Sequence, residues 1–481
     1  MMSSIYLAIA LIPFVILMIS IFIIILSMIF KRNHMFVAIV SGMSLILLLW
    51  SLFIIRRIIP IYITSLIYID FYTLWYVFII VFSGLFINIL AYFSLRNVFL
   101  YKEEFYLLFL ISILGAIFLV FSNHMFSLFL GIELMSLPVI GLMTYSYFQK
   151  KSIEVALKYI ILSIISSNFM LFGISLIYVT CGNLDFSSIK ISFLIDNLSN
   201  NKVLLFGIGF LLISFFFKLS LFPLHFWIPD IYKYTSPVVL CYLTTVIKVS
   251  MFGILIKLFL YFPYHQSKIL YLLIYVVSIF SIFFGSVMSL FQNNIKKLLG
   301  YSSISHIGYI IITLLIIEKY KIANESALIY LISYTISNVS IFGILSISEI
   351  LQDVKQIRIN DSLSYLGFFK EQPVLSIAMT IVMLSFLGIP MTFGFISKFY
   401  IIMLSTLEHF WLINFSILIN SVLSLYYYLR IIINLYSTNK QANLNYSFLG
   451  YLSFNIQIVL FVLILLIILL GIFPQIIINF F

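Results

Sequence analysis

The sequence predicts an all-α polytopic membrane protein with about fourteen transmembrane helices. Of its 481 residues, 64% are hydrophobic and 9% are charged, whereas a soluble domain has about 45–50% and about 25%. The charged residues bunch into short clusters, and the apolar runs between them reach about 20 residues, the length that a helix needs to cross a bilayer. Composition excludes a soluble fold. The runs also lack the alternation of barrel strands, which leaves helices as the structure that satisfies its own backbone in lipid.

The apolar runs are delimited by the charge clusters on either side. In order, they cover residues 5–30, 35–55, 71–95, 105–121, 125–147, 152–180, 203–227, 238–260, 269–291, 298–317, 326–347, 374–402, 410–436 and 451–472. The first run has no basic leader and is too long for the core of a cleaved signal peptide, so it is expected to be the first span. The loops are short, which predicts that no soluble domain is present.

Lysine and arginine are unevenly divided between alternate loops. Loops after odd-numbered runs hold fourteen of the 26, and loops after even-numbered runs hold seven. Since cytoplasmic loops are enriched in these residues, the odd side is expected to be cytoplasmic and both termini to lie outside. The net charge of +11 is then mainly a topology signal, so nucleic acid is not an expected partner.

In the seventh and the twelfth run, Pro223 and Pro390 lie deep within the apolar stretch. Proline removes a backbone donor and clashes with the preceding turn, so both helices are expected to be broken near mid-membrane. The broken runs are five apart, and an odd separation means that a repeated five-helix unit crosses the membrane in opposite directions, as in transporters with inverted repeats. The expected organisation is a three-helix segment at residues 1–104, a first repeat at 105–262, a second, inverted repeat at 263–437 and a C-terminal helix at 438–481, with one broken helix in each repeat.

Several ionisable residues lie inside the runs, where insertion scales assign roughly 2.5–3.5 kcal/mol to each central charge. The main candidates for proton transfer are Glu133, Lys218, Lys248 and Lys398, and a secondary set is Lys158, His225, His306 and Glu154. Glu154 and Lys158 have i, i+4 spacing and could equally form an interfacial salt bridge. His306 could equally be a hydrogen-bonded packing residue. Lys257 lies near the end of its run and is expected to extend to the lipid headgroups.

Neither a metal site nor a redox cofactor is expected in this chain. Cys181 and Cys241 are far apart in sequence and form no CxxC motif or cluster-binding set. Gly207 and Gly209 do not complete a GxGxxG motif. A haem would need axial histidines from neighbouring spans, for which His225 and His306 are weak candidates.

Several stretches of the sequence together resemble the antiporter-like membrane subunits of respiratory complex I. They are KLSLFPLHFWIPD at residues 218–230, Lys248, LGYSSISHIGY at 299–309 and SFLGIPMTFGFISKF at 385–399. The resemblance covers roughly residues 105–399. Within the family, GIELMSLP at residues 131–138 and SIEVALKY at 152–159 are most similar to the subunit N group of NADH-quinone oxidoreductases.

The resemblance implies a proton-translocating subunit of the oxidoreductase in which Glu133 matches the helix-five glutamate of the family, Lys218 the broken-helix lysine, Lys248 the helix-eight lysine and Lys398 the lysine of the second half. Flavin, iron–sulfur clusters and quinone are then expected in partner subunits. The expected partners are the other membrane-arm subunits and membrane lipid, without a stand-alone homo-oligomer. The expected location is a bacterial inner membrane rather than an organellar one.

A buried lysine suits this chemistry on physical grounds alone, because burial destabilises its charged form enough for it to release a proton near neutral pH. Glu133 is expected to pair with Lys218 and hold its proton, and loosening of the pair would pass that proton toward Lys248 and on toward Lys398. One alternative is a cation/proton antiporter of the same ancestry. Another, of a different class, is a non-transporting scaffold whose charges only fix helix packing.

Overall fold

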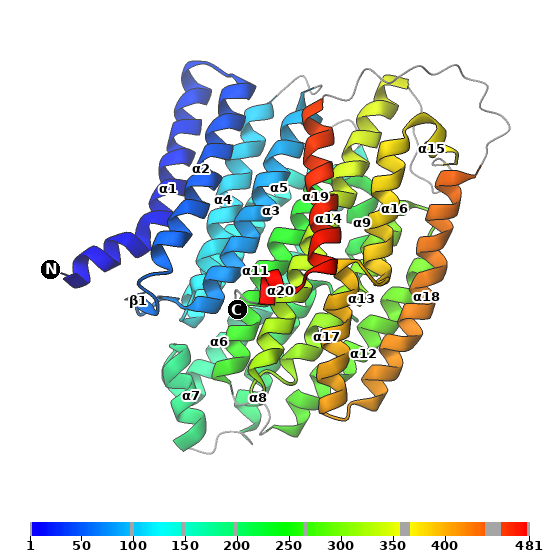
Figure 1. Ribbon diagram of the computed structural model, residues 1–481. Coiled ribbons are helices and arrows are strands. Elements are labelled where there is room, and N and C mark those ends of the chain that lie inside the picture. Colours follow the sequence, from blue (N-terminus) through cyan, green and yellow to red (C-terminus); the bar gives the residue numbers. More distant parts are fainter. Residues whose placement is uncertain are drawn as a thin grey trace. The chain divides into compact units, whose positions relative to one another are not determined.

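The computed structural model describes residues 2–96, 101–145, 150–195, 201–262, 267–355, 366–437 and 454–478. Within these ranges the chain is almost entirely helical, and eleven helices are long and apolar enough to cross a membrane (Figure 1). Shorter apolar helices occupy Pro373–Leu387, Phe393–Leu407 and Gln457–Ile472. The chain is therefore an all-helical membrane protein, as its composition predicts. The expected end of the fifth run at Tyr147 and start of the last run at Tyr451 lie outside the described residues.

The chain forms two compact units, of which the first contains Met1–Ser220 and Tyr234–Leu273 and the second contains Leu221–Lys233 and Ile274–Phe481. The elements of the first unit are α1 (Met2–Phe30), α2 (His34–Ile55), β1 (Ile61–Thr64), β2 (Ile67–Ile69), α3 (Phe71–Leu95), α4 (Lys102–Phe121), α5 (Met125–Met143), α6 (Lys150–Cys181), α7 (Phe186–Ile195), α8 (Lys202–Leu219), α10 (Pro237–Tyr242), the π-helix η2 (Leu243–Ile247) and α11 (Lys248–Tyr261). Helices α1 to α4 lie side by side in Figure 1.

Short polar side chains start several helices of the first unit. The Asn33 side chain accepts hydrogen bonds from two backbone amides at the start of α2. Asp70 forms a capping box with Thr73 at the start of α3, and His124 and Asn201 each cap one helix, α5 and α8. Such caps satisfy amides that a helix start leaves without intrahelical partners, so the apolar runs begin as helices at defined residues.

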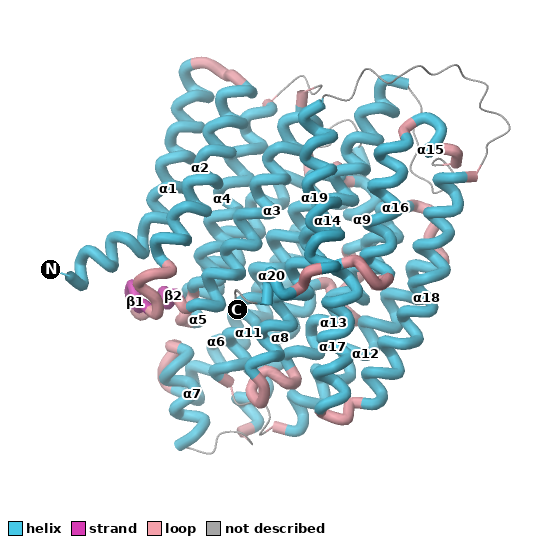
Figure 2. The backbone as a smooth tube through the Cα atoms, in the orientation of Figure 1, coloured by secondary structure: helices cyan, strands magenta, loops and turns pink. Residues whose placement is uncertain are grey.

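A β-hairpin between α2 and α3 is an element that the sequence pattern does not predict. Strands β1 and β2 pair antiparallel, with Ile61 opposite Ile69 and Tyr62 opposite Tyr68 (Figure 2). Each strand has no more than four residues, which is too short for alternation to be recognised against the apolar runs on both sides.

Glycines bring two pairs of helices of the first unit close together. A Cβ on Gly115 of α4 would lie 2.4 Å from the backbone nitrogen of Met135 in α5. A Cβ on Gly173 of α6 would lie 2.6 Å from the carbonyl oxygen of Gly207 in α8. Small residues of this kind allow close helix packing in membranes, so Gly207 serves the contact between α6 and α8.

The second unit contains the elements that follow α11 and the short segment after α8. They are α9 (Ile228–Tyr234), α12 (Lys268–Leu290), α13 (Ile295–Leu314), α14 (Lys321–Lys355), α15 (Phe368–Glu371), α16 (Pro373–Leu387), α17 (Phe393–Leu407), α18 (Trp411–Tyr436), α19 (Phe454–Ile472) and α20 (Gln475–Ile478). Tyr234 of α9 and the first turns of α12 belong to the first unit.

Both proline-containing runs are interrupted. Helix α8 ends at Leu219, and Ser220 follows with a φ of 63°. The helix expected over residues 203–227 thus ends eight residues early, since Pro223 lies in the turn that follows. In the twelfth run, α16 ends at Leu387 and α17 begins at Phe393, with Pro390 between them. Gly388 closes α16 with a φ of 79°, a conformation that costs glycine little.

Candidate functional site

Lys218 lies in the last turn of α8 and is 2% exposed. Its ammonium group donates a hydrogen bond of 2.6 Å to the hydroxyl of Ser163 in α6 and lies 5.6 Å from the centre of the Tyr159 ring. The carbonyl ends of a helix carry partial negative charge, so the end of α8 favours a cation here. The break after α8 therefore places a lysine where both a hydroxyl and a helix terminus can stabilise its charge.

Glu133 of α5 lies close enough to Lys218 to attract it electrostatically. Among the described residues, no ion pair within 4.0 Å joins the two side chains, and the hydroxyl of Ser163 is the hydrogen-bond partner of the Lys218 ammonium. One carboxylate oxygen of Glu133 is buried without a hydrogen-bond partner in the described part of the chain. The interaction between Glu133 and Lys218 in this structure is thus an electrostatic attraction at a distance rather than a direct ion pair.

The turn of α5 after Glu133 has an unusual set of backbone contacts. Pro138 lies inside α5 and provides no amide for the carbonyl of Leu134, four residues earlier. The hydroxyl of Ser112 in α4 donates to the next carbonyl, that of Met135, at 2.8 Å, and is also hydrogen-bonded to the Tyr242 hydroxyl. A pair of hydroxyls therefore contacts α5 at the residue two positions after the glutamate.

Lys248 is 2% exposed and is the first residue of α11, directly after the π-helix η2. In this wider turn, the hydroxyls of Thr244 and Thr245 both donate to the carbonyl of Cys241, at 3.0 and 2.7 Å. Single π-turns inside α-helices are frequent at functional sites. The eighth run is thus a helix with a local change of winding immediately before its buried lysine.

Glu154 and Lys158 form the expected i, i+4 ion pair on α6, with 2.9 Å between carboxylate and ammonium. The two side chains are 63% and 57% exposed. An exposed pair of this type contributes little to stability because solvent screens it. These two residues thus lie on the outer surface of the first unit, apart from the buried Lys218.

Lys398 of α17 contacts the end of the preceding half-helix. Its ammonium donates to the carbonyls of Phe386 and Leu387, at 2.7 and 2.8 Å, and lies 5.8 Å from the centre of the Tyr309 ring. These carbonyls belong to the last turn of α16, where intrahelical donors are missing. The second helix break therefore supplies the acceptors for this lysine.

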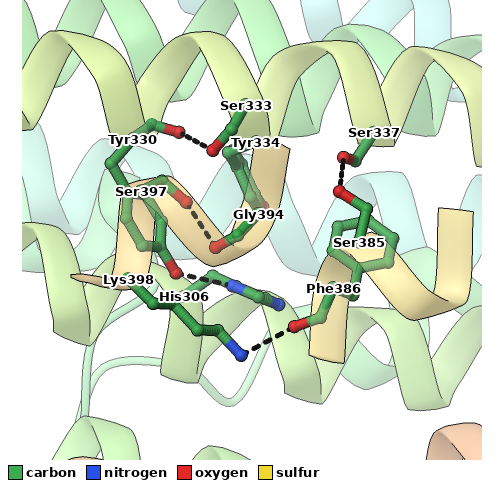
Figure 3. Close-up of a pocket in the computed structure, with 10 residues that line it drawn as sticks. All are labelled: His306, Tyr330, Ser333, Tyr334, Ser337, Ser385, Phe386, Gly394, Ser397 and Lys398. Carbon is green, nitrogen blue, oxygen red and sulfur yellow. Dashed lines mark hydrogen bonds between the residues drawn. The ribbon is translucent and has the colours of Figure 1, made fainter. Parts of the chain in front are cut away.

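His306 of α13 faces the same region from the opposite side. Its Nδ1 is 2.8 Å from the Tyr330 hydroxyl, and its Nε2 is 3.5 Å from the Tyr428 hydroxyl. Figure 3 shows His306 and Lys398 lining one small pocket together with Tyr330 and the half-helices α16 and α17. The serines of this pocket are Ser333, Ser337, Ser385 and Ser397. The second unit thus gathers a lysine, an imidazole and several hydroxyls.

His225 lies in the segment that joins the second unit after α8. It is 3% exposed, and its ring packs 4.4 Å from that of Phe284 and 5.7 Å from that of Phe222. Its Nδ1 is buried without a hydrogen-bond partner among the residues described. The structure places this histidine in an aromatic environment, and it does not line the pocket of His306.

Sequence reasoning singled out only ionisable residues within the runs and so missed several polar contacts of the site. Ser163 and Tyr159 contact Lys218, and Tyr330 and Tyr428 contact His306. The only local signal was a hydroxyl-bearing residue within an apolar run, which is common in this chain and therefore not selective. Among the described residues, no group of three His, Cys, Asp or Glu side chains is arranged to hold a metal ion.

Comparisons with known proteins agree on one family. Residues 122–424 match the family model described as NADH:quinone oxidoreductase/Mrp antiporter, TM. A subunit N of NADH-quinone oxidoreductase from Buchnera aphidicola subsp. Acyrthosiphon pisum (strain APS) is 46% identical over 431 residues, which are 89% of this chain and 88% of that protein. The subunit N from Buchnera aphidicola subsp. Schizaphis graminum (strain Sg) is 42% identical over 481 residues, covering 98% and 97% of the two chains.

Solved structures show the same fold at lower identity. A chain of respiratory complex I from Thermus thermophilus, determined with bound aureothin, has a TM-score of 0.80 at 24% identity and covers 96% of this chain and 97% of that one. A chain of an archaeal membrane-bound sulfane sulfur reductase scores 0.87 at 22% identity, covering 98% and 96%. A chain of the Mrp complex from Dietzia sp. DQ12-45-1b scores 0.83 at 15% identity, covering 99% and 96%.

With a family model over more than half of its length and two relatives above 40% identity, the chain belongs to the antiporter-like, proton-translocating membrane subunits of NADH-quinone oxidoreductase, in the subunit N family.

Proposed function

We propose that this subunit moves protons through two sets of buried groups, one in each unit. In the first unit, Lys218 takes and releases the proton, Glu133 sets its affinity for it, and Lys248 is the next carrier. Glu154 and Lys158, exposed at the start of α6, are the proposed groups of proton uptake. The absence of a tight Glu133–Lys218 ion pair suits this role, since a lysine locked to a carboxylate 3 Å away would hold its proton too firmly to cycle it.

In the second unit, Lys398 and His306 are the proposed carriers. The hydroxyls of Tyr330 and Tyr428 contact both ring nitrogens of His306, and an imidazole with a hydroxyl on each side can accept a proton at one nitrogen while the other loses one. His225 is proposed as a further carrier on the segment after the first helix break.

The observation that supports this proposal most strongly is the burial of Lys218 and Lys248 to 2% exposure each in a chain of this family. An ionised group at the bilayer centre is energetically costly, and such groups are therefore rare and typically mark ion or proton pathways. Moving one charge across the membrane potential involves roughly 2.3 kcal/mol per 100 mV, the same order as the cost of such burial, so a buried lysine is a switch of suitable size.

We also propose that residues 105–262 and 263–437 form two inverted five-helix repeats. The two interrupted runs, α8 with its following turn and α16–α17, support this proposal because each brings a lysine to a helix end. In the proposed assembly, the other membrane-arm subunits are neighbours of this chain, and the flavin, iron–sulfur clusters and quinone are in partner subunits. The proposed location is a bacterial inner membrane.

The test of the carrier role is Lys218→Arg in the assembled complex. Arginine keeps the charge and can donate to Ser163, but it does not release a proton at physiological pH. We expect NADH-driven proton uptake into proteoliposomes to fall to about a tenth or less, with quinone reduction slowed in parallel because the two are coupled.

Lys202→Arg, an exposed substitution at the other end of α8, is the matched control and should leave both activities unchanged. Native electrophoresis verifies assembly for each variant. Near-normal pumping by an assembled Lys218→Arg complex would show that this lysine is a fixed counter-charge rather than a carrier.

A further inference from the structure

Lys257 of α11 does not extend to the membrane surface as its position in the sequence suggests. It is 4% exposed, and its ammonium donates to the carbonyls of Ser122, at 2.7 Å, and Tyr68, at 3.2 Å. The same ammonium lies 5.2 Å from the centre of the Tyr68 ring. The expected snorkelling of Lys257 is therefore wrong, because carbonyls of the hairpin and of the residue that follows α4 lie within hydrogen-bond distance of its ammonium.

The acceptors of Lys257 belong to two different elements. Ser122 is the residue at which α4 ends, where carbonyls lack intrahelical donors and carry the partial negative charge of the helix. Tyr68 lies in β2. One side chain of α11 thus holds both the end of α4 and the hairpin.

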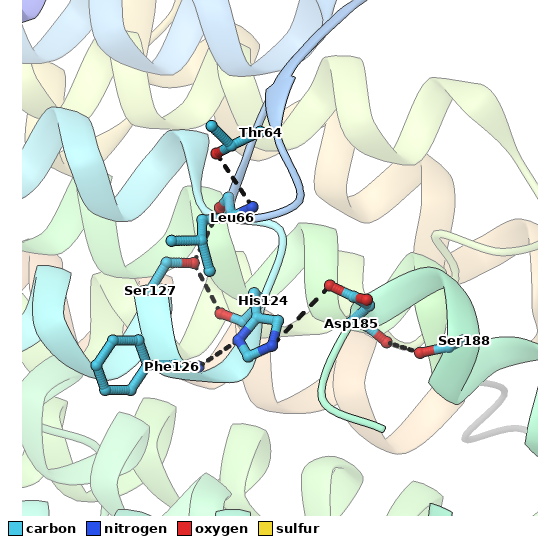
Figure 4. A network of polar contacts seen from close by, with 7 residues as sticks. All are labelled: Thr64, Leu66, His124, Phe126, Ser127, Asp185 and Ser188. Atoms are coloured by element: carbon cyan, nitrogen blue, oxygen red, sulfur yellow. Dashed lines mark hydrogen bonds and ion pairs between the residues drawn. The ribbon is translucent and has the colours of Figure 1, made fainter. Parts of the chain in front are cut away.

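The α4–α5 corner, defined here as Ser122–His124, is also attached directly to the hairpin. The amide of Asn123 donates to the carbonyl of Leu66 at 2.9 Å, and the Ser127 hydroxyl donates to the same carbonyl at 3.0 Å (Figure 4). Ile67 and Ser122 form an isolated β-bridge. The hairpin and the corner therefore form one structure, into which Lys257 inserts its charge.

The distance from this attachment to Lys248 along α11 is similar to the distance from the corner to Glu133 along α5. Lys248 is nine residues before Lys257 on α11, or about 13 Å along the helix axis. Glu133 is eight residues after the first residue of α5, or about 12 Å from the corner. A contact between Ser250 and Met135, 3.1 Å from hydroxyl oxygen to sulfur, joins α11 and α5 near that depth. The Lys257 contacts at one end and the Ser250–Met135 contact at the other fix the register of α11 relative to α5.

We propose that Lys257 is a positioning residue: a fixed cation that ties α11 to the α4–α5 corner and the hairpin, and so holds Lys248 and Glu133 at matching depths, without carrying protons itself. The proposal rests on the roles proposed above for Glu133 and Lys248.

The surroundings of Lys257 distinguish it from Lys398, which also donates to two carbonyls. Lys398 shares its pocket with His306, a side chain that can take a proton. The ionisable groups that face Lys257 are Asp70, which attracts it electrostatically, and Tyr68. The Asp70 side chain is engaged at the start of α3, where it accepts a hydrogen bond of 2.7 Å from the amide of Thr73. These surroundings favour a lysine that keeps its positive charge and does not exchange its proton.

The test compares Lys257→Arg with Lys257→Met in the assembled complex, with Lys218→Arg in parallel. Arginine keeps a permanent charge and several hydrogen-bond donors. A residue that acts only as a fixed cation should therefore tolerate this substitution, whereas a residue that carries protons should not. We expect Lys257→Arg to keep at least about half of the proton uptake in proteoliposomes, and Lys257→Met to lose most of it. Backbone hydrogen exchange should accelerate at least about tenfold at Asn123, Ser127 and the hairpin in Lys257→Met, and remain near wild type in α13 of the second unit.

Two results would overturn the proposal. One is an assembled Lys257→Arg complex that pumps as poorly as Lys257→Met while exchange at the corner stays protected, since this would make Lys257 a carrier. The other is unchanged exchange at the corner in Lys257→Met. Because hydrogen exchange does not depend on pumping, and Lys218→Arg reports on the carrier role by itself, failure of this inference can be told apart from failure of the proposed function.

Discussion

At the scale of single residues, the buried charges differ in what holds them. Lys218 donates to a hydroxyl, whereas Lys257 and Lys398 donate to main-chain carbonyls of other elements. A hydroxyl can accept one proton and donate another, while a carbonyl only accepts a hydrogen bond. The immediate partners thus distinguish Lys218 from Lys257, and what distinguishes Lys398 from Lys257 is the histidine that lines the same pocket as Lys398.

Glu133 provides the prediction at this scale. It attracts Lys218 without a direct ion pair, and a change of about 1.4 kcal/mol in this attraction alters proton binding about tenfold. We expect Glu133→Ala to lower coupled quinone reduction and proton uptake about tenfold in an assembled complex, and Glu133→Asp to keep part of both.

Glu104→Gln is the control for Glu133, since its exposed carboxylate lies 3.7 Å from Arg32, the one ion pair that it forms within the described ranges. This variant should behave like wild type. Full activity of an assembled Glu133→Ala complex would remove the glutamate from the mechanism.

At the scale of elements, the two half-helices of the twelfth run depend on one glycine. Gly394 of α17 lies so close to α16 that a Cβ would be 1.8 Å from the carbonyl oxygen of Ser385. The neighbouring carbonyls, those of Phe386 and Leu387, bind Lys398. The contact between the half-helices therefore determines whether Lys398 can reach its acceptors.

Gly394→Ala should force α16 and α17 apart. Overpacking of this kind costs about 1–3 kcal/mol, so we expect the midpoint of thermal inactivation of the complex to fall by several degrees and pumping to fall with it. Gly209→Ala in α8 is the matched control, because nothing lies within 4 Å of a Cβ built there, and it should be neutral. A Gly394→Ala complex with wild-type stability would contradict the close contact.

At the scale of the whole molecule, the division into two units follows the chain only in part. Leu221–Lys233, which comes directly after α8, belongs to the second unit. There, Ile228 and Tyr232 approach Gly300 of α13 so closely that a Cβ on the glycine would lie 2.9 Å from Ile228. The break after α8 thus separates a helix of the first unit from a segment that packs within the second unit.

The inverted repeat is the prediction at this scale. In an experimental structure of the membrane arm, residues 105–262 and 263–437 should superpose after a rotation about an axis in the membrane plane. The helix ends that hold Lys218 and Lys398 should then lie at similar depths. Superposition about an axis along the membrane normal would show parallel repeats instead and contradict the odd spacing of the breaks.

The sequence by itself determined the class of protein and the places where its regular structure fails. Hydropathy and the clustering of charges are local properties, and so is the effect of proline on its own helix. The sequence therefore sufficed to locate the apolar runs and the interruptions at Pro223 and Pro390. It also sufficed to place the buried lysines within spans. The motifs around Lys218 and Lys398 were sufficient to identify the family.

Only the tertiary structure decided which partners the buried charges have. Lys218 meets Ser163 across 55 residues, and Lys257 meets Ser122 across 135. Such contacts depend on how helices cross, which glycines such as Gly115 and Gly173 control, and the periodicity of one helix does not report on the helix that packs against it. For this reason the expected exposure of Lys257 was wrong and Ser163 was not foreseen as the partner of Lys218, although both lysines were correctly placed within their spans. The chain specifies its charges locally, and the packing of distant helices assigns each charge its partner.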